Sequence, residues 1–181
     1  MVKKKGLFLD RDGVINVDYG YVHTVEEFQF IDGIFDLTRL AVSKGYAICV
    51  VTNQAGIGRG YYSESEFKEL TIWMCDRFKE EGVLIDEVYY SPYHPVHGLG
   101  AYKKDDISRK PNSGMLRQAM LDLDIDIRAS VLIGDSVTDI QAGFSAGVSK
   151  NLYLGLDDIS RNSGLGNYIS ISNLSEAGAY L

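Results

Sequence analysis

Short apolar runs alternate with amphipathic segments along the whole chain, and this alternation constrains the fold more than any other feature. The apolar runs have the length of strands, and the segments between them have the apolar spacing of helices. Strands are expected at residues 6–9, 46–51, 85–90, 131–133, 151–154 and 168–171. Helices are expected at residues 33–43, 64–81, 112–123 and 137–146, and from residue 174 onward. Ser63 and Glu66 form a capping box at the start of the second helix, Asn112 is the expected cap of the third, and Gly56, Gly58 and Gly60 are expected to form a loop. Alternation of this kind predicts an α/β fold of three layers, Rossmann-like, with a central, mainly parallel sheet.

Length and charge narrow the class of protein. The 181 residues, 45% of them apolar, suit a single domain spanning 1–181 with a full core. A net charge of -7 disfavours nucleic acid and anionic membranes as partners. Cys49 and Cys75 are not closely spaced and indicate reduced thiols, and the first apolar run is too short for a signal peptide or membrane span. We therefore expect a cytoplasmic protein, and a monomer.

Polar residues follow the first two predicted strands directly. Asp10 and Asp12 come after the first strand, and Thr52 ends the second. Ligands of parallel sheets gather at the carboxyl ends of the strands. Two carboxylates at that edge can share a divalent cation or divide the roles of nucleophile and acid/base. Taken alone, the pair also fits an ordinary surface, and Thr52 an ordinary turn.

Two further positions repeat this placement. Lys110 precedes a predicted helix, where a cation suits a phosphoryl oxygen, although a solvated lysine is the alternative. Asp135 and Asp139 form Gly-Asp-x-x-x-Asp after the fourth strand. Acidic residues also favour the first turn of a helix, so capping is the alternative there. We expect Asp135 to bind metal and Asp139 to have a supporting or structural role.

The order of these motifs resembles the haloacid dehalogenase superfamily of phosphatases. The resemblance rests on Phe8–Val14, Val51–Gln54, Arg109–Pro111 and Ile133–Asp135. It implies a magnesium-dependent phosphomonoester hydrolase in which Asp10 forms a phospho-aspartate and Asp12 is the general acid and base. Thr52 and Lys110 would bind the transferring phosphoryl group. Magnesium would be held by Asp10, the backbone carbonyl of Asp12, and Asp135.

A narrower resemblance, over residues 7–155, is to the heptose-bisphosphate phosphatase subgroup, which includes histidinol-phosphate phosphatases. It rests on Asp10–Val17, Gly20–Val22, Phe28–Gly33 and Thr52–Ile57. It implies no large cap domain and a small phosphorylated sugar as substrate. The implied substrate-binding residues are Asp18, Tyr19, Gly20, Tyr21, Asn53, Gln54, Ala55 and Arg109. Lys103, Lys104 and Arg109 are candidates for binding a second anionic group of the substrate, and the role of Arg59, in a glycine-rich turn beside the expected pocket, is left open.

The long segment from Ser91 to Pro111 departs from that subgroup. Many members bind zinc there through Cys-x-His and Cys-x-Cys pairs, and the matching positions are Ser91, Tyr93, Asp106 and Ser108. These are poor zinc ligands, so we expect no structural zinc. His94, His97, Asp105 and Asp106 are interpreted as solvated loop residues rather than as another metal site.

Two rival functions use similar residues. A receiver-like signalling module also has acidic residues, a threonine and a lysine around a phospho-aspartate, but Asp12 favours turnover. A nucleic-acid 3′-phosphatase shares the Thr-Asn-Gln and Gly-Ile-Gly-Arg-Gly stretches, but the acidic charge disfavours it. Hydrolysis of a simple phosphate ester, and a comparison of a 3′-phosphorylated oligonucleotide with a sugar bisphosphate, would separate these possibilities.

Overall fold

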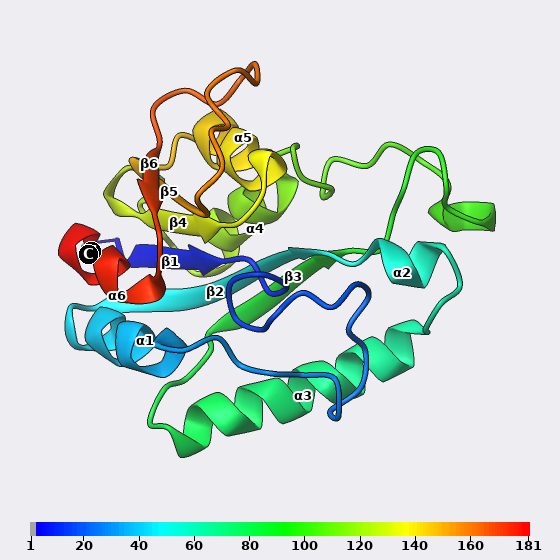
Figure 1. Ribbon diagram of the computed structural model, residues 1–181, viewed down its shortest axis with the longest axis horizontal. Helices are drawn as coiled ribbons and strands as arrows, with labels where there is room; N and C mark the ends of the chain where they lie inside the picture. The colour runs from blue at the N-terminus through cyan, green and yellow to red at the C-terminus, as the bar shows by residue number, and fades with distance from the viewer. Residues whose placement is uncertain (1–2) are drawn as a thin grey trace.

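The computed structural model describes residues 3–181 and is built on one six-stranded parallel sheet (Figure 1). The strand order is β3-β2-β1-β4-β5-β6, and every neighbouring pair is parallel. The strands are β1 (Lys5–Leu9), β2 (Tyr46–Asn53), β3 (Glu87–Ser91), β4 (Val131–Gly134), β5 (Lys150–Leu154) and β6 (Ile169–Ile171). The sheet is thus parallel throughout, and the predicted α/β fold is confirmed.

The helices of residues 3–181 are α1 (Ile34–Ser43), α2 (Ala55–Gly58), α3 (Glu64–Glu80), α4 (Gly114–Asp122), α5 (Val137–Ala146) and α6 (Leu174–Ala177). They lie on the two faces of this sheet, except for α2, which follows the end of β2 (Figure 1). Short 3₁₀ turns occupy Gly100–Tyr102, Ile127–Ala129 and Gly178–Tyr180. Within residues 3–181, the longest helix falls short of what a membrane crossing by an apolar helix requires.

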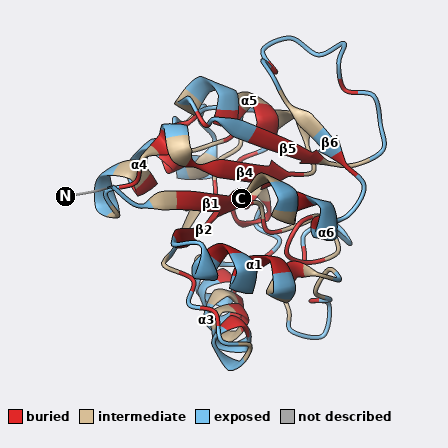
Figure 2. Ribbon diagram, turned by 90° about the vertical axis from the view of Figure 1, so that its left-hand side faces the viewer, coloured by how far each residue is buried: buried red, intermediate tan, exposed pale blue. Residues whose placement is uncertain are grey.

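The core has two halves because strand side chains alternate between faces. Leu7 and Leu9 of β1 pack with α1, α3 and α6, whereas Phe8 packs with α4 and α5. The central strands β1, β2 and β4 are buried on both faces, as Figure 2 shows, which explains their uninterrupted apolar sequence. Three layers result, and the carboxyl ends of the strands share one edge.

Local hydrogen bonds fix where the long helices begin. Ser63 and Glu66 form the predicted capping box: Ser63 Oγ accepts from the Glu66 amide, and Glu66 Oε2 accepts from the Ser63 amide. A second capping box joins Ser136 and Asp139 at the start of α5. These two boxes orient the first turns of α3 and α5.

Two local predictions are wrong. The stretch around Gly56 and Gly58 was expected to be a loop, but it includes helix α2. A Cβ on Gly58 would lie 2.3 Å from the Pro92 carbonyl oxygen, so this glycine permits close packing instead of flexibility. Asn112 was expected to cap the next helix, but Ser113 is the N-cap residue, and Nδ2 of the Asn112 side chain donates to the Asp106 carbonyl.

Candidate active site

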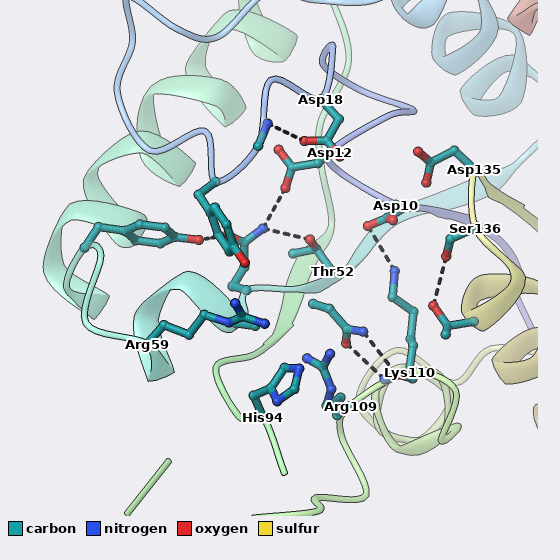
Figure 3. A pocket seen from close by; sticks show the side chains of 17 residues that line it. Asp10, Asp12, Asp18, Thr52, Arg59, His94, Arg109, Lys110, Asp135 and Ser136 are labelled. Carbon is teal, nitrogen blue, oxygen red and sulfur yellow. Dashed lines mark hydrogen bonds and ion pairs between the residues drawn. The ribbon is translucent and has the colours of Figure 1, made fainter. Parts of the chain in front are cut away.

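The carboxyl ends of β1, β2 and β4 open into a cavity of about 470 Å³. Figure 3 shows its side chains. The lining residues are Asp10, Asp12, Asp18, Gly20, Tyr21, Thr52, Asn53, Gln54, Ala55, Arg59, Tyr62, His94, Arg109, Lys110, Asp135, Ser136 and Thr138. The structure therefore brings together every residue predicted as catalytic, magnesium-binding or substrate-binding except Tyr19, whereas the candidates Lys103 and Lys104 for a second anionic group lie outside the lining. The Tyr19 side chain is 62% exposed and bonds Gln29 outside the cavity.

Three carboxylates converge at the base of the cavity. One ligand oxygen each from Asp10, Asp135 and Asp139 lies within 4.8 Å of the others. Burial, followed by the negative charge of Asp139, raises the pKa of Asp10 to about 8 and that of Asp135 to about 7. A Cβ on Gly13 would lie 1.8 Å from Asp135 Oδ2, so only glycine leaves room for this carboxylate.

The carboxylate oxygens at the base of the cavity fit a magnesium ion. Magnesium prefers oxygen ligands, and a divalent cation would relieve the repulsion between Asp10 and Asp135. Asp139 is less available than the other two because its oxygens already contact Lys110 and Ser136. Asp10 and Asp135 are therefore the side chains suited to hold the ion, and Asp139 has the supporting position expected from the sequence.

Lys110 is buried beside these carboxylates. Its Nζ lies 3.0 Å from Asp10 Oδ1 and 2.5 Å from Asp139 Oδ1, and it donates to the Val51 carbonyl at 2.8 Å. Burial disfavours the ammonium, but the two carboxylates outweigh it and raise the pKa of Lys110. Asn53 clamps the same residue from β2: its Oδ1 accepts from the Lys110 amide and its Nδ2 donates to the Lys110 carbonyl.

Asp12 is held by a separate network. The buried guanidinium of Arg11 bonds both of its carboxylate oxygens and also donates to the Val22 carbonyl. Gln54 Nε2 donates to Asp12 at 3.0 Å and to Thr52 Oγ1 at 2.9 Å. Tyr62 donates to Gln54 Oε1 at 2.6 Å, which fixes the orientation of that amide. The Asp12 carboxylate is thereby aimed at the cavity beside Thr52.

The loop after β1 forms one wall of the cavity. Asp18 Oδ1 accepts from the Gly20 amide at 2.8 Å, and Gly20 and Tyr21 both have positive φ angles, 81° and 57°. Left-handed backbone is strained for a tyrosine. The Tyr21 ring packs edge-on against Tyr61 and lies 5.6 Å from the Arg59 guanidinium. Arg59 is thereby placed in the cavity wall.

Several lining residues were missed or undervalued from the sequence. Ser136 and Thr138 follow β4 and could have been found by the rule that polar residues after strands meet at one edge. Tyr62 carries no such signal, because its role depends on Gln54. His94 was interpreted as a solvated loop residue, but it lines the cavity.

Three of the four residues at the positions of the zinc ligands, Ser91, Asp106 and Ser108, are joined by side-chain hydrogen bonds. Ser108 Oγ lies 2.7 Å from Asp106 Oδ1 and 3.0 Å from Ser91 Oγ. Tyr93 instead packs against Lys104, whose ammonium also pairs with Asp106. Two hydroxyls, a phenol and one carboxylate do not fit zinc, which requires four thiolate, imidazole or carboxylate ligands. Lys104 is engaged here and is not part of the cavity lining, and neither is Lys103.

Comparisons with known proteins agree with this geometry. Residues 107–155 match the HAD-hydrolase-like family. The D-glycero-alpha-D-manno-heptose-1,7-bisphosphate 7-phosphatase of Burkholderia mallei is 54% identical over 160 residues, 88% of this chain and 85% of that protein. The chain belongs to this phosphatase family. It is a haloacid dehalogenase-like phosphatase, as its motifs predict.

Two other members of this phosphatase family are informative. The D-glycero-beta-D-manno-heptose-1,7-bisphosphate 7-phosphatase of Haemophilus influenzae is 49% identical over 148 residues, 82% of this chain and 80% of that one. The D,D-heptose 1,7-bisphosphate phosphatase of B. bronchiseptica, a crystal structure with magnesium and phosphate, superposes with a TM-score of 0.83. It is 23% identical and covers 97% of both chains, so it supports the fold.

Proposed function

We propose that this phosphatase removes the 7-phosphate of D-glycero-D-manno-heptose 1,7-bisphosphate. The observation that supports the proposal is that one cavity contains both a catalytic centre and a separate pair of positively charged side chains. Asp10, Asp12, Thr52 and Lys110 gather at its base, and the guanidinium groups of Arg59 and Arg109 line the rest. A substrate with an anion at each end satisfies both parts, and the relatives at about half identity are named for such a substrate.

In the first step an Asp10 carboxylate oxygen attacks phosphorus and the bond from phosphorus to the sugar oxygen breaks. Asp12 gives its proton to the leaving sugar oxygen, a role that suits a carboxyl group fixed by Arg11 and Gln54. Thr52 and Lys110 donate to the phosphoryl oxygens as charge builds on them. The products of this step are the free sugar hydroxyl and a phospho-aspartate at Asp10.

In the second step Asp12 takes a proton from water, and the water oxygen attacks the phosphorus of the phospho-aspartate. The bond from phosphorus to Asp10 breaks, which releases inorganic phosphate and restores the carboxylate. Lys110 remains beside Asp10 throughout, because Asp139 and the Asn53 clamp hold it there.

Magnesium is the cofactor that this site fits, with Asp10, Asp135 and the backbone carbonyl of Asp12 as its protein ligands. When bound, the ion supplies positive charge that offsets the repulsion between the nucleophile and the phosphate. We expect no structural zinc, since Ser91, Tyr93, Asp106 and Ser108 lack the ligands.

This activity places the protein in the synthesis of nucleotide-activated heptose for lipopolysaccharide or capsule. Action in the cytoplasm as a monomer, without nucleic-acid or membrane partners, is part of the proposal. The net charge of -7 supports the absence of nucleic-acid and membrane partners, and two free cysteine thiols support the cytoplasm.

Steady-state kinetics on a panel of substrates tests the proposal. The panel holds both anomers of the heptose bisphosphate, the heptose 7-monophosphate, histidinol phosphate and a 3′-phosphorylated oligonucleotide. We expect the highest kcat/KM for one anomer of the bisphosphate. A higher value for histidinol phosphate or for the oligonucleotide would assign the site to that substrate instead.

A further inference from the structure

The loop between β3 and α4 places one imidazole at the cavity wall. Figure 3 shows His94 beside Arg59 and Arg109, and all three side chains line the cavity. They come from two segments far apart in sequence, α2 with its C-cap and the long loop. The amide of Leu99 donates to the Gly58 carbonyl at 2.8 Å and joins these segments. The cluster is therefore a built part of the fold.

Hydrogen bonds fix which nitrogen of His94 carries the proton. Nδ1 lies 3.2 Å from the Val96 amide and 3.0 Å from the His97 amide, so it accepts two backbone hydrogen bonds. A nitrogen that accepts from N–H donors has no proton, so the neutral ring carries its proton on Nε2. Within residues 3–181, the hydrogen bonds of the His94 ring are these two at Nδ1, and Nε2 has no protein acceptor.

The surroundings also keep this ring neutral. Burial, followed by the positive charges of Arg109 and Arg59, lowers the pKa of His94 from its ordinary value. Protonation at Nδ1 would additionally break both backbone hydrogen bonds. His94 thus presents a fixed, uncharged N–H donor between two cations.

The two guanidinium groups lack a neutralising partner. Among the described residues, neither Arg59 nor Arg109 forms an ion pair with a carboxylate. The buried Arg59 Nε has no hydrogen-bond partner, and Arg109 donates only to the Tyr93 carbonyl. Burial, followed by the nearby charge of Arg59, lowers the pKa of Arg109 and outweighs the opposite effect of the Asp105 charge, which forms no ion pair with it. In a chain with net charge -7, two unpaired arginines so close together indicate a site for an anion.

We propose that His94, Arg59 and Arg109 form the binding subsite for the non-scissile phosphoryl group of the substrate, and that His94 is a specificity-determining residue there. The inference rests on the proposed function and deepens it. The arginines supply charge, and the imidazole supplies one oriented donor without adding a third positive charge. A phosphoryl group presents enough acceptor oxygens for all three. A sugar hydroxyl at the same place would not relieve the repulsion between the arginines.

Two substitutions of His94 distinguish the effect of its Nε2 donor from the effect of its hydrogen bonds to the loop backbone. In His94→Asn the amide oxygen can still accept from the Val96 amide, but the Nε2 donor is lost. In His94→Gln the amide nitrogen reaches toward the position of Nε2, so a donor is kept. His97→Gln is the matched control: it lies in the same loop, its ring is outside the cavity lining, and its amide still bonds Nδ1 of His94.

The measurement is KM and kcat for the heptose 1,7-bisphosphate and for the 7-monophosphate, with a thermal melt of each variant. We expect His94→Asn to raise KM for the bisphosphate by about 10-fold more than KM for the monophosphate, the size of one hydrogen bond to a charged group. His94→Gln should have a smaller effect, and His97→Gln none.

The outcomes distinguish the inference from the proposed function. If the wild type prefers histidinol phosphate or the oligonucleotide to both heptose phosphates, the proposed function fails. If the wild type hydrolyses the bisphosphate and the 7-monophosphate with equal kcat/KM, the proposed function stands and the inference fails. If the wild type prefers the bisphosphate and His94→Asn keeps that preference at an unchanged melting temperature, the inference alone fails. Nitrogen-15 spectra of the His94 ring give an independent check that needs no variant. A neutral Nε2–H signal with inorganic phosphate bound supports His94 as an uncharged donor, and an imidazolium signal overturns it.

Discussion

The ammonium group of Lys110 lies 2.5 Å from the carboxylate of Asp139, and both side chains are buried. Asp139 is fixed in turn by the amide and hydroxyl of Ser136 at the start of α5. The helix cap after β4 therefore determines where the lysine points, although Lys110 comes from a different loop. One residue acts as a helix cap and as a positioning group for the phosphoryl site.

Asp139→Asn is expected to reduce both stability and activity. Removing one partner of a buried ion pair typically costs about 3–5 kcal/mol, and a displaced Lys110 would contact the phosphoryl group poorly. Urea denaturation and kcat/KM measure the two effects. The control is Asp36→Asn, which removes an exposed partner of Arg39 and should cost less than about 1 kcal/mol. Equal stability of the two variants would contradict the positioning role.

Asp10→Asn is expected to abolish turnover in a protein that still folds. The amide has nearly the same shape as the carboxylate but is a poor nucleophile and a weaker magnesium ligand. Removal of a nucleophile typically costs on the order of 10⁴-fold or more in kcat. A single-turnover assay for the phospho-enzyme should detect it in the wild type only. Near-normal turnover in the folded variant would refute the mechanism.

Asp12→Asn is expected to slow both chemical steps by about 10²–10⁴-fold, which is the usual range for general acid–base assistance. The deficit should be smaller for an aryl phosphate, because its leaving group needs no proton. The comparison is kcat for p-nitrophenyl phosphate against kcat for the sugar phosphate. A loss of the same size for both substrates would count against Asp12 as the acid.

The sequence predicts those parts of the fold and site that depend on local patterns. The apolar runs identify all six strands, and the Ser63–Glu66 pair identifies the start of α3, because a capping box is encoded within four residues. Strand ends also bring Asp10, Thr52 and Asp135 to one edge, since parallel strands end together.

The rest depends on contacts between distant residues, which no local pattern encodes. Asn53 and Lys110 are 57 positions apart yet exchange two hydrogen bonds. His94 resembles a solvated loop histidine until the packing of its loop against α2 brings it to Arg59. The glycines of α2 resemble a flexible loop in sequence, but close contact with Pro92 requires the one at position 58.

The long loop is also tied to α3 through Glu64, and this contact depends on pH. Tyr102 and Tyr90 each donate to Glu64 at 2.7 Å, and these bonds lower the pKa of Glu64 from its ordinary value of 4.5. A lowered pKa in the folded state means that the stabilisation is present above the unfolded value and is lost as pH falls through the folded value.

Glu64→Gln should therefore destabilise the protein near neutral pH, by less than about 1 kcal/mol because the site is partly exposed. The difference from wild type should shrink below pH 4.5, the ordinary value for this group. Urea denaturation of both proteins across this range measures it, with Glu69→Gln on the same helix as control. A difference that grows as pH falls would contradict the assignment.

The last prediction is that the protein folds and works without zinc but needs magnesium. The Ser91, Asp106 and Ser108 side chains hold one another where a zinc site would need thiolates and imidazole. Burial opposes ionisation of Asp106, but hydrogen bonds from Lys104 and Ser108 outweigh it and lower its pKa to about 2, so this network stays charged at neutral pH. A serine hydroxyl ionises too reluctantly to replace a thiolate, and one aspartate cannot complete a tetrahedral site.

Elemental analysis should find no stoichiometric zinc, and a zinc-selective chelator should leave activity and melting temperature unchanged. EDTA should abolish activity, and added magnesium should restore it, because the proposed magnesium ligands Asp10 and Asp135 are not among the residues at the zinc positions. Stoichiometric zinc would refute the first half of this prediction, and activity that survives EDTA would refute the second.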